Sequence, residues 1–156
     1  MLRRMPRRLT RAPIPLLHRV APLLGGRFVL IEHLGRRSGL PCHVVLEVVH
    51  REPGALMVIS GCGPDAQWFR NIQAEPVVRI WSGGIRDAVA VAVPLAAEHG
   101  TAILESYRHH HPLAARVLGQ AIGIPEFTHG KPVPVRRAEE LPLVRISARQ
   151  APRGGE

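Results

Sequence analysis

The residue types best suited to binding chemistry lie in two glycine-containing turns. Residues 35–39 read Gly-Arg-Arg-Ser-Gly, which places two guanidinium groups and a hydroxyl together with no acidic residue among them. Glycine lets the backbone turn tightly and point its N–H groups outward, and arginine binds phosphate and carboxylate groups through paired hydrogen bonds. Residues 60–64 read Ser-Gly-Cys-Gly-Pro and form a second turn of this kind. Together the two turns predict a site for an elongated anionic cofactor.

The arginine turn also has a simpler interpretation as a charged, solvated surface loop. Surface turns are more often of mixed charge, however, and Arg36 and Arg37 have no carboxylate near them in the sequence. Adjacent like charges repel one another unless an anion or solvent relieves the repulsion. Both interpretations stay open on these residues alone.

The excess of positive charge lies mainly at the start of the chain. Residues 1–27 hold seven of the 21 basic residues and no acidic residue, and the remaining 14 basic residues nearly balance the 12 acidic ones. A nucleic-acid-binding protein needs a basic stripe on its folded surface, so this distribution disfavours nucleic acid as a partner. A basic arm of this kind could instead contact an anionic membrane surface.

The length of 156 residues suits one domain with a sizeable core. We expect a basic N-terminal arm with a short helix over residues 1–25, a cofactor-binding domain over 26–150 and a disordered tail over 151–156. No segment approaches the roughly 20 apolar residues that a membrane-spanning helix needs. We expect a cytoplasmic protein with reduced thiols, peripheral at the inner face of the membrane if the arm binds lipid.

Hydrophobic alternation and turn signals predict about six strands, mostly joined by hairpins, with helices inserted between them. The expected strands cover residues 28–34, 41–50, 55–60, 77–81, 85–93 and 141–148. The expected helices cover residues 13–24, 65–74, 94–107 and 112–119, and residues 123–135 read as loop. This order lacks regular strand–helix alternation and favours a mainly β (α+β) fold, a small antiparallel barrel with flanking helices.

A hairpin between the second and third strands would bring the two turns together. If that hairpin is centred on Pro53, facing positions sum to about 105, and Cys42 and His43 lie opposite Gly63 and Cys62. We therefore expect both turns at one end of the sheet.

Other chemistry-bearing residues have competing structural interpretations. Trp68 and Phe69, behind an expected cap at Asp65, either pin a helix to the barrel or form a wall for a flat ring. The run His109 to His111 is no metal site, because consecutive helical positions point about 100° apart. Tyr107 is either a packing residue or a proton donor to substrate.

The order of these motifs resembles the deazaflavin (coenzyme F420)-dependent nitroreductase family. That family typically shows Gly-Arg-Lys-Ser-Gly-x-Pro-Arg, then Trp-Tyr-x-Asn-Leu, then an Asn-Pro or Asp-Pro step. The likeness is good over residues 26–93 and looser elsewhere. It implies a split β-barrel of the flavin-reductase type and a deazaflavin cofactor with a phosphate and an oligoglutamate tail.

The resemblance also implies which residues contact the cofactor. The phosphate would be held by Arg36, Arg37 and Ser38. The cofactor channel would be lined by His43, Val44, Val45 and Leu46. The ring would contact the backbone of Ile59, Ser60 and Gly61, and its other side would be closed by Trp68, Phe69 and Asn71.

Two positions depart from the family pattern. Cys42 stands where the family has an arginine, with His43 as a partial substitute, and Phe69 replaces a tyrosine. Substrate tyrosines of some relatives are not clearly present, which leaves Tyr107 as the only candidate.

The resemblance implies an enzyme, an F420-dependent oxidoreductase that transfers a hydride to a small-molecule electron acceptor such as a quinone, enone or nitro compound. One alternative is a non-catalytic binder or carrier of F420, of another flavin such as FMN, or of haem. Another is a peripheral membrane-surface protein. No metal is expected, and a homodimer is expected by analogy with related barrels.

Overall fold

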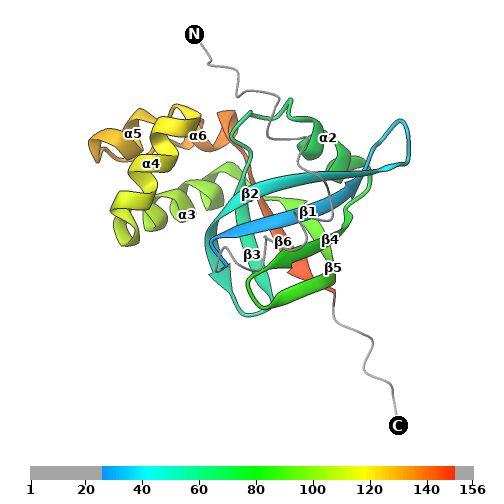
Figure 1. Cartoon of the computed structure of the whole chain (residues 1–156). Helices are drawn as coiled ribbons and strands as arrows, with labels where there is room; N and C mark the ends of the chain where they lie inside the picture. The colour runs from blue at the N-terminus through cyan, green and yellow to red at the C-terminus, as the bar shows by residue number, and fades with distance from the viewer. Residues whose placement is uncertain (1–25, 150–156) are drawn as a thin grey trace.

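The computed structural model describes residues 26–149, which form a closed six-stranded antiparallel barrel with helices packed outside it (Figure 1). Round the barrel the strands follow the order β1-β2-β3-β6-β5-β4. The strands are β1 (Phe28–Leu34), β2 (Pro41–Glu52), β3 (Ala55–Ile59), β4 (Val77–Ser82), β5 (Ile85–Pro94) and β6 (Leu143–Ala148). The helices are α2 (Gln67–Ala74), α3 (Ala97–His110), α4 (Pro112–Ile122), α5 (Pro125–His129) and α6 (Val135–Glu140). The predicted split-barrel class is confirmed.

The predictions for residues 1–25 and 151–156, including the helix over 13–24, concern residues outside the described range. None of the helices between residues 26 and 149 is long and apolar enough to cross a membrane.

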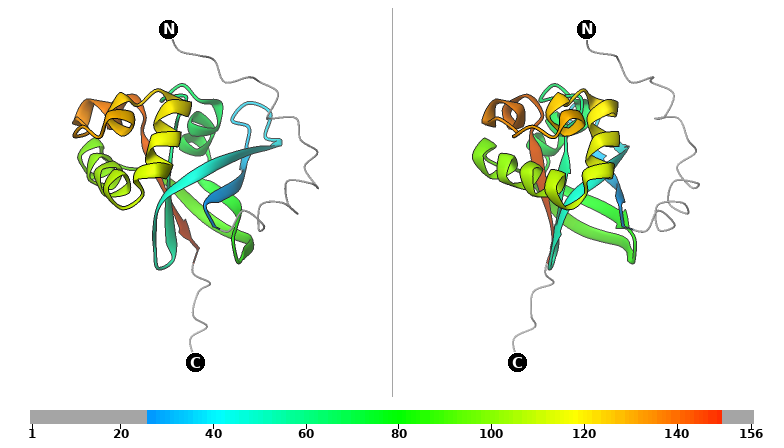
Figure 2. Two further views of the ribbon diagram at one scale, coloured as in Figure 1. Left: turned by 60° about the vertical axis from the view of Figure 1, so that its left-hand side comes forward. Right: turned by 90° about the vertical axis from the view of Figure 1, so that its left-hand side faces the viewer.

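The barrel interior forms because alternate residues of each strand point inward. Val29 and Ile31 of β1 are fully buried in a cluster that draws on all six strands. Trp68, Phe69 and Ile72 of α2 belong to the same cluster, so α2 closes one end of the barrel (Figure 2). Each such side chain contributes about 1.5–3 kcal/mol on burial.

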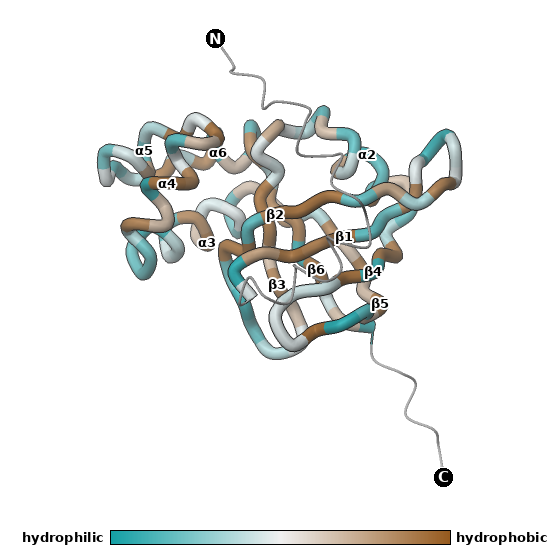
Figure 3. The backbone as a smooth tube through the Cα atoms, in the orientation of Figure 1, coloured by the Kyte–Doolittle hydropathy of each residue, from teal (hydrophilic) through white to brown (hydrophobic). Residues whose placement is uncertain are grey.

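A second core lies between the outside of the barrel and helices α3–α6, which we call the helical lobe. Met57 and Ile59 of β3 and Leu143 of β6 supply the barrel side of this core. Leu104 and Phe127 are among the residues that supply the lobe side. Brown apolar backbone follows β2 and β3 as they pass beneath the lobe (Figure 3). The two cores share one sheet, which fixes the lobe to the barrel.

Two expectations about local structure were wrong. Residues 123–135 are not simply loop, because they contain α5 and are followed by α6. Their prolines and glycines mark helix ends: Pro125 begins α5, while Gly123 and Gly130 end α4 and α5 in the left-handed conformation. Because these helix ends lie close together in the sequence, their prolines and glycines resemble the composition of a loop.

The hairpin between β2 and β3 is present, but its register differs from the expected one. Glu52 faces Ala55 across a turn at Pro53 and Gly54, and Gly54 has a φ of 75°. The pairing reaches only Val48 with Val58, so Cys42 does not pair with Gly63. A β-bulge between Val48 and His50 shifts the register.

Gly119 is a position where the fold excludes any side chain. A Cβ added there would lie 2.6 Å from the Cβ of Phe127 and 2.8 Å from the carbonyl oxygen of Ile124. Neither atom can move without displacing α5.

We expect Gly119→Ala to lower the free energy of unfolding by about 1–3 kcal/mol, because overpacking outweighs the better helix propensity of alanine. Urea denaturation measures the change. Gly84→Ala is the control, since a Cβ there meets nothing within 4 Å. Equal stability of the two variants would contradict the packing of α4 on α5.

Candidate functional site

The arginine turn between β1 and β2 is closed by its own backbone. The N–H of Gly35 donates to the carbonyl of Leu40 at 2.9 Å, and the N–H of Gly39 donates to the carbonyl of Gly35 at 2.7 Å. Gly39 has a φ of 67°, which a side chain would disfavour. The hydroxyl oxygen of Ser38 accepts the N–H of Leu40 at 3.2 Å. The turn is thus a defined loop that presents Arg37 and Ser38 to solvent.

Helix α2 anchors this turn through the side chain of Asn71. The amide oxygen Oδ1 of Asn71 accepts the backbone N–H of Arg36 at 3.1 Å and its guanidinium Nη1 at 2.9 Å. The same Nη1 donates to Oε1 of Gln67 at 3.0 Å. The arginine turn and the start of α2 therefore lie side by side.

The other end of the Asn71 amide contacts a buried histidine. Nδ2 of Asn71 lies 3.2 Å from Nδ1 of His33, and both residues are at most 5% exposed. Burial, with a smaller contribution from the nearby His43, lowers the pKa of His33 to about 4. His33 is consequently neutral near physiological pH and can accept a hydrogen bond at Nδ1.

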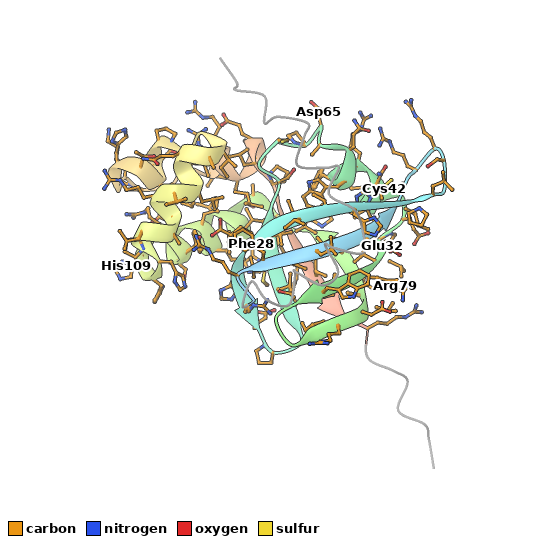
Figure 4. The ribbon with its side chains drawn as sticks, in the orientation of Figure 1. Phe28, Glu32, Cys42, Asp65, Arg79 and His109 are labelled. Atoms are coloured by element: carbon orange, nitrogen blue, oxygen red, sulfur yellow. The ribbon has the colours of Figure 1, made fainter. Side chains whose placement is uncertain are left out.

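The charge of the turn fits an anionic ligand. Arg36 is held only by neutral amide oxygens, and within residues 26–149 no carboxylate pairs with Arg36 or Arg37. The ion pairs that arginines do form with carboxylates lie away from this turn, for example that of Arg79 with Asp87. Figure 4 shows Cys42 and Glu32 at the same end of the barrel as the turn, and His109 far away on the helical lobe. An anionic group bound here would meet two positive charges that no carboxylate among residues 26–149 pairs with.

The first turn of α2 adds to this positive region. Its N-cap residue is Ala66, with no side-chain cap, so the expected cap by Asp65 was wrong. Without that cap the N–H groups at the helix start are not bonded to a capping side chain, and the helix dipole is positive there.

The expected channel residues on β2 lie on two different faces of the strand. Val44 and Leu46 pack against the barrel core, whereas Val45 is 41% exposed. Nε2 of His43 lies 3.0 Å from a carboxylate oxygen of Glu32. A ligand along one face of β2 could meet His43 and Val45, or Val44 and Leu46, but not all four side chains.

The second turn contacts the helical lobe. The buried hydroxyl of Ser60 donates to the carbonyl of Gly63 at 2.7 Å. A Cβ on Gly61 would lie 2.7 Å from Cγ2 of Ile122, so α4 ends directly over this turn. The side chain of Ile59 is buried beneath the lobe, and Cys62 is exposed. Of the three residues expected at the ring, Ile59 and Ser60 are buried and Gly61 is partly exposed.

The structure places the aromatic candidates in the cores. Trp68 and Phe69 are 8% and 5% exposed, edge to face with ring centroids 5.9 Å apart. They pin α2 to the barrel, and their contact with a cofactor ring stays a prediction.

The hydroxyl of Tyr107 also has a hydrogen-bond partner within the protein. Its hydroxyl donates to Oε1 of Glu47 at 2.7 Å, and burial, reinforced by Glu47, raises its pKa. The role of proton donor stays a prediction, and it would require this hydrogen bond to open. No group of three metal-ligating side chains occurs between residues 26 and 149.

The sequence analysis missed His33 and Gln67. His33 continues the inward-facing alternation of Val29 and Ile31, so an ionisable residue at a core position was the available signal. Gln67 lies one helical turn before Asn71, which places both amides on one face of α2.

Comparison with known proteins adds a family to this geometry. The family model described as F420H(2)-dependent quinone reductase matches residues 14–116. No curated protein matches the chain.

Several solved structures share the fold. One described as an F420-H2 dependent reductase is 21% identical, covering 78% of this chain and 94% of its own, with a TM-score of 0.50. One described as a domain-swapped dimer is 20% identical, covers 85% of this chain and 92% of its own, and has a TM-score of 0.53. An FMN-binding protein from Nostoc punctiforme, related to pyridoxamine 5'-phosphate oxidase, is 15% identical over 85% of this chain and 75% of its own, with a TM-score of 0.53. At these identities the likeness shows the split-barrel fold.

The depressed pKa of His33 makes stability depend on pH. The folded state binds a proton at His33 less readily than the unfolded state, whose ordinary pKa is 6.5. Its contribution to stability is therefore complete above about pH 6.5 and is lost as the pH falls toward 4.

We expect the free energy of unfolding to fall by roughly 1–3 kcal/mol more in the wild type than in His33→Asn as the pH drops from about 7 to about 4. Asparagine does not titrate, so the variant controls for Glu32, His43 and the other groups. Parallel pH profiles from urea denaturation would show that His33 titrates normally in the folded protein.

Proposed function

Because the chain belongs to the F420H(2)-dependent quinone reductase family and is an F420-dependent oxidoreductase, we propose that it reduces a quinone, enone or nitro-type acceptor with the cofactor phosphate held at residues 35–39. The single observation that supports this best is the pair Arg36 and Arg37, positive side chains with no carboxylate partner among residues 26–149. When bound, reduced F420 supplies the hydride. The chain itself binds the cofactor, orients it and shields its ring.

At the proposed phosphate site, Arg36 has a different role from Arg37 and Ser38. Arg36 is fixed by Gln67 and Asn71, so its guanidinium is oriented before any ligand arrives. Arg37 and Ser38 are exposed and can close on the ligand. Charge-assisted hydrogen bonds of this kind contribute about 1.5–3 kcal/mol each. Cys42, half-buried beside the turn, contributes no charge where the family pattern has an arginine.

From the arginine turn the site extends toward the second turn and the lobe. The proposed path follows β2 to the backbone at Ile59, Ser60 and Gly61. The end of α4 over Gly61 limits access of water on that side. Tyr107 remains the candidate proton donor to the acceptor.

The family match favours F420 over the other cofactors considered. The phosphate of FMN would satisfy the same arginines, and no feature of residues 26–149 favours haem. Contact of residues 1–25 with an anionic membrane surface stays a prediction, because these residues lie outside the described range.

Removal of Arg37 tests the phosphate role directly. We expect Arg37→Ala to weaken binding of oxidised F420 by about 10- to 100-fold, because one charged donor is lost. Fluorescence titration measures the dissociation constant, with FMN as a competing ligand.

Arg86→Ala is the matched control, an exposed arginine in the β4–β5 hairpin. Because Arg37 has no described protein partner, its variant should fold like the wild type. An affinity for F420 equal to that of the wild type would show that Arg37 does not hold the phosphate.

We also propose that two copies of the chain pair through the outer face of the barrel. Leu34, Val77 and Val89 are 37–43% exposed there and line a hollow of about 360 Å³. The neighbour described as a domain-swapped dimer supports association.

Sedimentation equilibrium should show a dimer for the wild type. Val77→Glu should shift it toward monomer, because pairing would remove the new carboxylate from water in a hollow that Glu32 and Glu75 already line. Leu113→Glu, on the exposed side of α4, should remain a dimer. A monomeric wild type would contradict the pairing.

A further inference from the structure

Four polar residues are buried within residues 26–149, and two of them bond to each other. The hydroxyls of Ser60 and Ser82 each donate to a backbone carbonyl, an ordinary way to satisfy a buried hydroxyl. His33 and Asn71 instead form a side-chain pair between β1 and α2. Burying an imidazole and an amide is costly unless each is bonded, so the orientation of this pair is strongly constrained.

The donors on Arg36 determine how the Asn71 amide is oriented. A backbone N–H and a guanidinium can only donate, and both point at one atom of Asn71. That atom must be the carbonyl oxygen. The amide nitrogen then faces Nδ1 of His33 and donates to it at 3.2 Å. Nδ1 of His33 must therefore lack a proton, which leaves the ring hydrogen on Nε2.

The surroundings of His33 favour this neutral form. On β2 the position facing His33 is Cys42, and the next residue, His43, faces Glu32. A positive charge on His43 would repel a charge on His33. The carboxylate of Glu32 is directed to His43 at 3.0 Å. From α2 only the Asn71 amide bonds to His33, and Arg36 lies beyond that amide.

The position of Arg36 leaves one edge of its guanidinium available. Nη1 uses its two hydrogens on the oxygens of Gln67 and Asn71. No acceptor among residues 26–149 bonds to Nε or Nη2. The edge formed by Nε and Nη2 is the one that binds a phosphate through two parallel hydrogen bonds.

We propose that His33 and Asn71 are positioning residues, which hold the guanidinium of Arg36 so that its Nε–Nη2 edge faces an anionic ligand. The imidazole of His33 accepts a hydrogen bond from the amide nitrogen of Asn71, and the amide oxygen of Asn71 holds the guanidinium of Arg36. Neither residue needs to touch the ligand, so Asn71 acts through Arg36 rather than as a contact to the ring. The inference rests on the proposed phosphate site at residues 35–39.

The energetic consequence is preorganisation. An arginine side chain that must be ordered on binding loses rotamer freedom, and a ligand then binds more weakly. We expect His33→Leu and Asn71→Leu each to weaken binding of oxidised F420 by about tenfold. His33→Asn should stay within about twofold of the wild type, because its side-chain oxygen can replace Nδ1 as the acceptor.

A double-mutant cycle separates positioning from general structural damage. In an Arg36→Ala background, His33→Leu should cause no further loss of F420 affinity, since the residue it positions is gone. Equal effects of His33→Leu in both backgrounds would overturn the inference. If Arg36→Ala and Arg37→Ala both bind F420 like the wild type, the proposed phosphate site itself fails.

A measurement on the unmodified protein keeps the test independent of folding of the variants. The ¹⁵N chemical shifts of the His33 ring near pH 7, without ligand, should show an unprotonated Nδ1 and a protonated Nε2. A hydrogen on Nδ1 would overturn the inference, because the Asn71 amide could then not face Arg36 with its oxygen.

Discussion

The contact between the oxygen of Asn71 and Arg36 is the interaction on which the candidate site depends. It joins the turn between β1 and β2 to helix α2 through a backbone and a guanidinium hydrogen bond. Without it the arginine turn would be a surface loop, since Arg37 and Ser38 are exposed and the other hydrogen bonds that close the turn lie within it. The contact places a positive side chain beside the start of a helix, and the two together favour an anion.

The barrel makes this contact possible by fixing both partners. Trp68 and Phe69 are buried in the core and hold α2 across the end of the barrel, which leaves Asn71 facing His33. The aromatic residues thus serve the site through packing. The helical lobe acts similarly at the second turn, where Ile122 lies against Gly61. Packing thus fixes both α2 and the helical lobe beside the candidate site. A rigid site suits an enzyme whose cofactor provides the chemistry.

Much of the architecture was predictable because its signals are local. Strand alternation gave β1 and β4 nearly to the residue, and the lack of strand–helix alternation indicated an antiparallel barrel. The short helices α5 and α6 were not predicted, because their proline and glycine boundaries resemble loop composition. The β2–β3 register was also missed, because the two-residue turn at Pro53 and Gly54 already pairs Glu52 with Ala55, ahead of the β-bulge.

The sequence by itself determined that Arg36 and Arg37 lie in a glycine turn without acidic neighbours, and the order of its motifs indicated the family. Only the tertiary structure decided which side chains hold Arg36 in place. His33 and Asn71 are 38 positions apart, and nothing local relates them. Their pairing, the neutral state of the imidazole and the resulting orientation of Arg36 arise from burial at the junction of β1 and α2, because desolvation and hydrogen-bond satisfaction depend on neighbours distant in the chain.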